Sequence, residues 1–450
     1  MRKIQTIRAA CLIVIVAIPN AMAHAAEQQL FVGAAVRDTT PMQEWFPLSG
    51  TSRIQLGQLV GVIDPIHVRV IAVGNGETPA LVVTFEAGDA PSPETFLPGL
   101  SRHTGVPTDA IYYGGTHGHS SPTTKIDPNV PATELYNKYV YEQMIAAADE
   151  AIAKMRPATV GIGYSESYIN TNRQRFYELE DGTTKGAQGY NPTGPSDKTL
   201  SVIRFSDLQG KPIAFIVHYA VHNTTMYANR FDGNDNGVSA DIAGAVSGHL
   251  EAKFEGAVAN WIPGAAGDQN PIISNEYFTP NPETGEQEIQ MMGRAVVELV
   301  EFYGKIQFAD VLTALSNIQT VTSEARISYA TGDGTLPPYT EGQQDVRIQL
   351  RMLRIGNIAL VGTAGELFNS IGVYMQEHSL VEHTLVSNQV RIPDEYTHVE
   401  GVKAITSYQP DDYALIHDGW HTNNRRYAVG SINGGYTTLM NRMIESTKQQ

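Results

Sequence analysis

Cysteine is nearly absent from this sequence: among 450 residues the only one is Cys11. It lies within the first 25 residues, which have the order of a secretory signal, with basic residues, then an apolar run over 9–19, then small residues over 21–25. Cleavage there would leave no thiol, which excludes disulfides, thiolate metal ligands and cysteine nucleophiles from the mature chain. Any metal ion must then be bound by histidine, carboxylate or tyrosine.

Long apolar runs are also missing. The run in the predicted signal is too short to cross a membrane, and no later stretch approaches the roughly 20 apolar residues that a spanning helix needs. We therefore expect residues 1–25 to be a signal peptide, and residues 26–450 to be exported to the periplasm or secreted, without a transmembrane segment. The sequence leaves the oligomeric state open.

Positive charge is scarce. The chain has 31 Lys and Arg against 47 Asp and Glu, and its formal charge of −16 becomes −19 when Arg2, Lys3 and Arg8 are removed with the signal. This negative charge argues against nucleic acid or an anionic membrane as a partner. The simplest explanation of the charge is that it keeps the protein in solution.

Short β-branched runs alternate with longer helical patterns. The runs at 68–73, 80–85 and 213–217 are apolar and bounded by Gly, Pro or Asn, which predicts buried strands. Apolar residues at three-to-four spacing predict helices over 132–154, 239–254, 286–302 and 366–378. Two polar stretches, about 178–198 and 331–344, have the composition of surface loops or, equally, of linkers. The pattern indicates an α/β chain, with 26–450 as one catalytic unit.

Two histidines stand together in the segment His117-Gly118-His119, which follows the predicted strand 111–113. If the backbone is extended there, both rings face one side, as metal binding or proton transfer would require. A pair with this spacing is more often structural, so the segment alone decides nothing.

A second pair, His218 and His222, ends the predicted strand that begins at Pro212. Four histidines at two strand ends favour a metal site, because each buried ring nitrogen needs a partner. His218 still lies in the apolar run and is expected to be a core residue, whereas His222 enters a loop and is the better ligand candidate.

Glu366 follows another buried strand pattern, 357–361, at the predicted start of a helix. By itself it suits the positive end of a helix dipole. Together with two histidines it would complete a two-His, one-carboxylate set that leaves a position open for water, as in catalytic zinc sites.

Several short segments appear in an order typical of one family. They are 115–120, Ala220-Val221-His222, Ser239-Ala240-Asp241, Gly267-Asp268-Gln269-Asn270-Pro271 and Gly365-Glu366, with further matches at 31–34, 64–69 and 407–412. The chain thus resembles the neutral/alkaline ceramidase family over most of its mature length. The resemblance implies mixed β-sheets flanked by helices in a neutral-ceramidase-like catalytic domain.

The resemblance also implies a ligand set for Zn²⁺, namely His117, His222, Glu366 and a C-terminal tyrosine. Tyr408 is our choice for that tyrosine, although Tyr396 and Tyr413 lie close to it in the sequence.

Two further residues are expected to face the substrate by the same resemblance: His119, and Arg173 of Asn172-Arg173. Asp241 or Asp268 would orient a ligand histidine, although helix capping or loop hydrogen bonding explains these aspartates equally well. Asn270 stands where long members of the family have a serine, so no serine nucleophile is expected there. Those members also carry a β-sandwich domain, for which this sequence has no room.

The expected reaction is hydrolysis of an amide bond in a small-molecule or lipid-like N-acyl compound by water on zinc. His119 would move the proton to the leaving nitrogen, and Arg173 with Tyr408 would stabilise the oxyanion. Two alternatives stay open: the same site could cleave an ester, lactone or phosphoester, or the chain could be a periplasmic protein that binds metal or carbohydrate without catalysis.

Overall fold

The computed structural model describes residues 29–448, apart from 51–57, 77, 232, 234, 282, 284–286, 393–406, 417, 418 and 420–424. The predicted signal peptide and Tyr396 lie outside the described residues. No helix within the described part of the chain is both long and apolar enough to span a membrane.

An eight-stranded sheet forms the centre of the molecule, in the order β12-β10-β9-β6-β1-β3-β4-β5. Its strands are β1 (Phe31–Asp38), β3 (His67–Gly74), β4 (Ala80–Phe85), β5 (Ile111–Gly115), β6 (Arg156–Glu166), β9 (Thr199–Asp207), β10 (Pro212–Tyr219) and β12 (Val258–Pro263). The sheet is mixed. The strand β4 is parallel to β5 and antiparallel to β3, and β10 is parallel to β12 and antiparallel to β9. The strands predicted at 68–73, 80–85 and 213–217 all belong to it.

A second, four-stranded sheet lies over the first, in the order β16-β17-β18-β20. It consists of β16 (Ile327–Leu336), β17 (Val346–Ile355), β18 (Ile358–Gly362) and β20 (His383–Ser387). Side chains of β17 alternate between two cores: Leu353 and Ile355 pack toward the eight-stranded sheet, whereas Ile348 and Leu350 pack with α8 (Ile432–Ser446). This alternation follows from the two-residue period of a strand.

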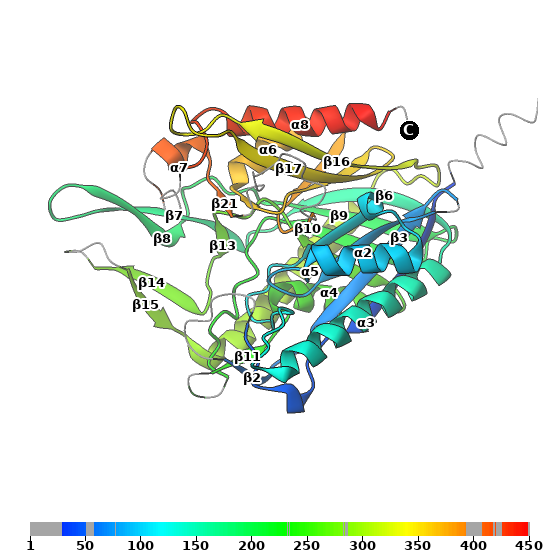
Figure 1. Ribbon diagram of the computed structural model, residues 1–450, viewed down its shortest axis with the longest axis horizontal. Coiled ribbons are helices and arrows are strands. Elements are labelled where there is room, and N and C mark those ends of the chain that lie inside the picture. The colour runs from blue at the N-terminus through cyan, green and yellow to red at the C-terminus, as the bar shows by residue number, and fades with distance from the viewer. Residues whose placement is uncertain are drawn as a thin grey trace, which may run out of the picture.

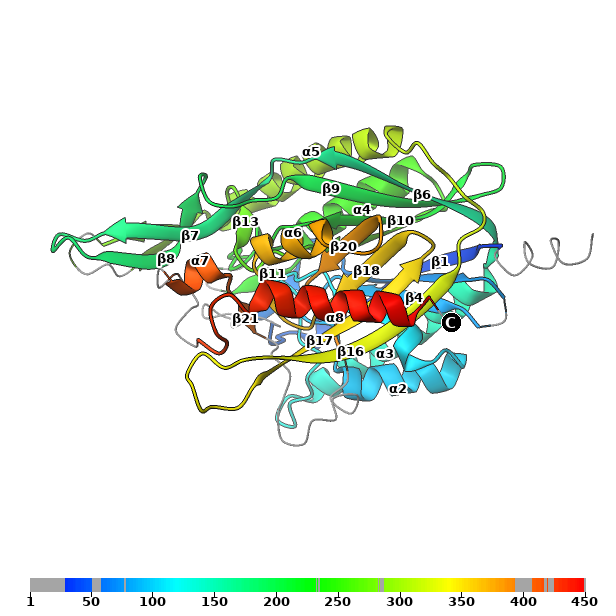
Figure 2. The same cartoon turned by 90° about the horizontal axis from the view of Figure 1, so that it is seen from above.

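Helices cover the two outer faces. On the free side of the large sheet lie α2 (Pro93–Thr104), α3 (Pro131–Ala153), α4 (Asp241–Lys253) and α5 (Val296–Ser316), and on the free side of the small sheet lie α6 (Asn369–Glu377) and α8. Figure 1 shows the resulting layers, with α8 at one side and α3 to α5 at the other, and Figure 2 looks down on α8 and the small sheet. The α/β fold class is confirmed, and strands buried on both faces explain the continuous apolar runs in the sequence.

Two β-hairpins project together from one end of this body (Figure 1). One joins β7 (Asn170–Glu178) to β8 (Thr184–Asn191), with β13 (Gln269–Pro271) paired to β7, and the other joins β14 (Glu276–Pro280) to β15 (Gln287–Met291). The remaining described elements are β2 (Leu59–Val62), β11 (Asn236–Val238), β19 (Glu366–Leu367), β21 (Tyr408–Gln409), α7 (Asp412–Ile416) and the short helices at Gln43–Trp45, Thr108–Ala110 and Gly293–Ala295.

Three predicted elements are wrong. Most of 178–198 is the β7–β8 hairpin and the first part of 331–344 belongs to β16, since pairing with neighbouring strands overrides their polar composition. The helix predicted over 286–302 starts only at Val296, after Gly293 with φ of +67°, a conformation that interrupts a right-handed helix. The helices predicted near 132–154 and 239–254 are confirmed as α3 and α4.

Candidate metal centre

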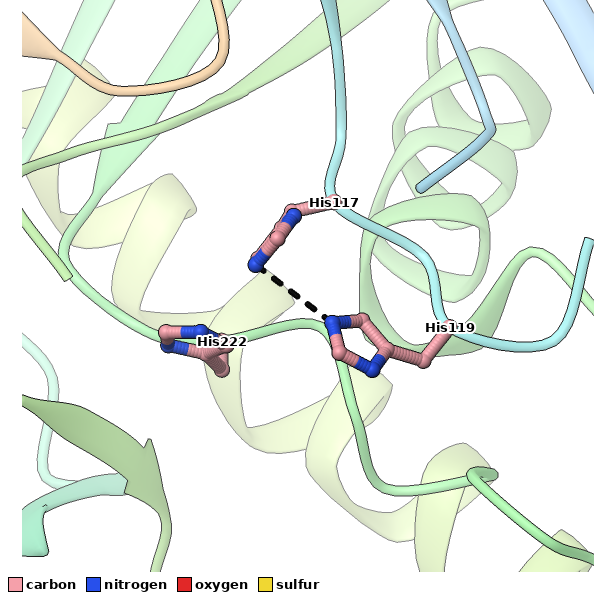
Figure 3. A group of neighbouring side chains, drawn as sticks. All are labelled: His117, His119 and His222. Atoms are coloured by element: carbon pink, nitrogen blue, oxygen red, sulfur yellow. Dashed lines mark hydrogen bonds between the residues drawn. The ribbon is translucent and has the colours of Figure 1, made fainter. Parts of the chain in front are cut away.

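Three histidine rings meet near the ends of β5 and β10, in a group whose nitrogens could hold a metal ion (Figure 3). Nε2 of His119 lies 3.4 Å from Nε2 of His117, and the ring centres of His117 and His222 are 4.6 Å apart. The predicted extended backbone is wrong at His117, whose φ of +63° lies in the left-handed region. The rings converge because the chain turns sharply at this residue.

Glu366 joins the histidines from the small-sheet side of the molecule. Its Oε2 lies 3.1 Å from Nε2 of His222 and 3.3 Å from Nε2 of His117. The prediction that Glu366 starts a helix is wrong, because α6 begins at Asn369 and Glu366 lies in β19, which pairs in parallel with β21. The Leu367 carbonyl of β19 accepts a hydrogen bond of 2.8 Å from the N–H of Gly267. Backbone pairing on both sides of β19 therefore holds the residue that carries the carboxylate.

The second nitrogen of each ligand candidate shows which tautomer is present. Nδ1 of His222 is 2.7 Å from the Ala266 carbonyl, and Nδ1 of His117 is 3.2 Å from the Gly88 carbonyl. A carbonyl only accepts hydrogen bonds, so Nδ1 carries the proton and the Nε2 lone pairs face each other and Glu366. Three donor atoms at this separation can hold a cation between them, and a two-His, one-carboxylate set suits zinc. The residues present therefore fit a metal ion.

Burial and neighbouring charges set the protonation of the rings. Burial, together with the Arg173 charge, lowers the pKa of His222 to about 3. Burial and the neighbouring rings lower the pKa of His119 well below its usual value. For His117 burial has the same effect, but the Glu366 carboxylate outweighs it and raises the pKa. His222 and His119 are thus neutral near pH 7, the form that can bind a metal or accept a proton.

Arg173 of β7 is buried beside His222, with Nη2 3.1 Å from Nε2 of that ring. Its Nε and Nη2 donate to the Gly267 carbonyl at 3.2 and 2.6 Å, and Nη1 donates to Oδ1 of Asn270 at 3.0 Å. The predicted position of Arg173 in the site thus agrees with the structure. Asn270 holds the guanidinium in place.

Tyr408 lies opposite Glu366 in the pairing of β19 with β21. Its ring stacks on that of His222 with centres 6.4 Å apart, and Cζ of Arg173 lies 5.3 Å from its ring centre. Burial raises the pKa of Tyr408 to about 12, so its hydroxyl stays protonated. Tyr413, the other described candidate, is 53% exposed and packs its ring against Phe176. The structure thus brings Tyr408, and not Tyr413, to the metal centre.

The two predicted supporting aspartates accept hydrogen bonds from backbone N–H groups and, in Asp268, also from an asparagine side chain. Asp241 accepts hydrogen bonds from the N–H groups of Met226 and Ile242, each at 2.7 Å, so it fixes the loop after His222 rather than a histidine ring. Asp268 accepts from the Asn369 N–H and from Nδ2 of Asn172, each at 2.7 Å, and so ties α6 to β7. Hydrogen bonding in loops and at the first turns of α4 and α6 therefore describes both residues.

Asn223 was missed by the sequence reasoning. Its carbonyl accepts from the His119 N–H at 3.2 Å, and its side chain bonds to the Ala240 carbonyl and the Ala243 N–H at 3.0 and 3.1 Å. It therefore ties the two histidine loops to the start of α4. The only sequence signal is its place directly after His222. His218 is a satisfied core residue as predicted, with Nε2 2.9 Å from the Val386 carbonyl.

No family model and no curated protein matches this chain in sequence. Comparison with solved structures gives a clear result: the chain has a neutral-ceramidase-like fold. It matches the neutral ceramidase from Pseudomonas aeruginosa with a TM-score of 0.67 and 15% identity, over 94% of this chain and 75% of that one. A ceramidase complexed with C2 matches with the same TM-score and identity, over 94% of this chain and 76% of that one.

Proposed function

We propose that this protein is a zinc-dependent hydrolase that cleaves the amide bond of an N-acyl compound. The observation that carries the proposal is the convergence of His117, His222 and Glu366. Oε2 of Glu366 lies 3.1 Å from Nε2 of His222 and 3.3 Å from Nε2 of His117. The likeness in fold to proteins named ceramidases supports an amide substrate. Zinc in such a site supplies a water-derived nucleophile at neutral pH and polarises a carbonyl group.

In this proposal His119 moves the proton. Its neutral ring lies within 3.4 Å of His117 and is partly exposed, so it can reach both the attacking water and the substrate. Nε2 accepts the proton that the water loses and then donates it to the departing amide nitrogen. The carbon–nitrogen bond breaks as the amine leaves, and the proton that His119 took from the water is the one that the amine carries away.

Arg173 and Tyr408 would stabilise the negative charge that develops on the carbonyl oxygen. Arg173 is held by the Gly267 carbonyl and by Asn270, and therefore need not reorganise during the reaction. Tyr408 remains a hydrogen-bond donor, because its pKa is about 12.

The test is a panel of N-acyl amides, carboxylic esters and phosphoesters, assayed with purified zinc-loaded protein. We expect amide hydrolysis that disappears together with bound zinc in His117→Ala and His222→Ala. The variant His103→Ala is the control, because His103 is exposed and pairs with Asp149 on the surface. Activity confined to phosphoesters would reject the amidase proposal. Zinc binding without hydrolysis of any compound would favour a binding protein instead.

A further inference from the structure

A cavity of about 390 Å³ opens between the β7–β8 hairpin and the segment 270–276. None of the site histidines lines it. Its walls are formed by Thr171, Arg175, Gln188, Gly189, Tyr190, Asn270, Pro271, Ile272, Ile273, Ser274 and Glu276. The two hairpins that project side by side in Figure 1 carry several of these residues.

One wall of the cavity is also part of the metal centre. Asn270 lines the cavity and accepts the hydrogen bond from Arg173, which in turn contacts His222. Thr171 faces Asn270 in the pairing of β7 with β13. Thr171, Arg173 and Arg175 occupy alternate positions of β7 and so project from one face of the strand. A molecule in the cavity would therefore contact Asn270, which holds the arginine that contacts His222.

The walls combine an apolar surface with one carboxylate. Ile272 and Ile273 are 39% and 49% exposed, which is unusual for isoleucine and places apolar surface at the cavity. Among the described residues, none hydrogen-bonds to the carboxylate of Glu276, whose pKa burial raises to about 7 against the effect of Arg173. The other charged group, Arg175, already donates to the Tyr190 carbonyl at 2.9 Å. Glu276 is thus the negatively charged acceptor among the residues that line the cavity.

We propose that this cavity binds the amine portion of the substrate, with an apolar part against Ile272 and Ile273 and a hydrogen-bond donor, ammonium or hydroxyl, against Glu276. The inference rests on the proposed amide hydrolysis. A carboxylate suits the amine portion, because the hydrocarbon of an acyl chain has no donor for it. At about 390 Å³ the cavity is near the small end of ligand sites, which span roughly 300–1,000 Å³, so the amine portion is compact.

The experiment uses three octanoyl amides that differ only at the end of the amine portion. They are the amides of ethane-1,2-diamine, ethanolamine and propylamine, which end in ammonium, hydroxyl and methyl. The measured quantity is kcat/KM of each donor-bearing amide relative to the propylamide, a ratio that does not depend on the fraction of folded enzyme. A charged hydrogen bond of ~1.5–3 kcal/mol predicts that the zinc-loaded enzyme prefers the ammonium compound by about 10- to 100-fold.

Three variants decide the matter. Glu276→Gln should lose most of the ammonium preference and keep part of the hydroxyl preference, because an amide oxygen still accepts, whereas Glu276→Leu should lose both. Glu178→Gln is the matched control, as this exposed glutamate ends the same strand β7 outside the cavity. Preferences that persist in both Glu276 variants, or that are absent from the wild type, would overturn the cavity assignment. If the zinc-loaded wild type cleaves no amide at all, the proposed function itself fails.

Discussion

Zinc should stabilise this protein against heat, and His222→Ala should remove that effect. In the folded protein Oε2 of Glu366 lies 3.1 Å from Nε2 of His222 and 3.3 Å from Nε2 of His117, so a cation finds three donors together that the unfolded chain keeps apart. A ligand at 100 times its dissociation constant contributes about 2.7 kcal/mol to the free energy of unfolding. For 450 residues, with an unfolding entropy of about 0.9 kcal/mol/K, this corresponds to a rise in Tm of about 3 °C.

The assay is differential scanning calorimetry of chelator-treated protein with and without added zinc. Wild type and His103→Ala should show the full rise in Tm, and His222→Ala less than about 1 °C, because two of the three donors bind zinc far more weakly. An undiminished rise in His222→Ala would refute the reasoning. It would mean that zinc binds to a different set of residues.

Three further outcomes follow from the same contacts. Asn270→Ala removes the acceptor that holds Nη1 of Arg173, so we expect kcat to fall about 10-fold. The metal content, measured by inductively coupled plasma mass spectrometry, should stay at the wild-type value. A change in metal content without a change in kcat would contradict a positioning role. Burial raises the pKa values of Asp241 and Asp268 to about 7, so both prefer the protonated form when folded. The contribution of these two groups to the free energy of unfolding should therefore fall as the pH rises from about 4 through 7. In urea denaturation of the metal-free proteins, Asp268→Asn, which cannot ionise, should gain stability relative to wild type over this range, and a difference that stays constant with pH would count against it. Gly267→Ala would place a Cβ 2.5 Å from the Glu366 carbonyl oxygen of β19. It should therefore lower the free energy of unfolding in urea by ~1–3 kcal/mol and weaken zinc binding. Wild-type values of both quantities would show that β19 can move to make room.

Elements with strong local signals were predicted well. The strands β3, β4 and β10 are buried on both faces, which their sequences show as unbroken apolar runs. The helices α3 and α4 likewise lie close to their predicted bounds. In these segments local preference and tertiary packing favour the same structure, so the sequence suffices.

Segments that depend on distant partners were predicted poorly. The β8 strand reads as a polar loop, and only its pairing with β7 makes it extended. The strand that contains Glu366 was missed for the same reason. It has only two residues and forms by pairing with β21, about 40 positions later in the chain. Patterns within a short window contain no information about such partners.

The histidines and Glu366 were predicted from the residues themselves, Arg173 and Tyr408 were predicted through the resemblance, and the geometry of the site was not predicted. The side chains of His117, His222, Glu366, Arg173 and Tyr408 do come together. The backbone carbonyls that fix their tautomers and orientation have no side-chain signature, so no sequence pattern could indicate them.

The most direct test of the account is a zinc titration of chelator-treated wild-type protein, with amide hydrolysis and bound metal measured on the same samples. We predict that activity on an N-acyl amide rises in proportion to bound zinc and levels off at one ion per chain, with no such rise in His117→Ala. Full amide hydrolysis by protein that contains no metal would contradict the account.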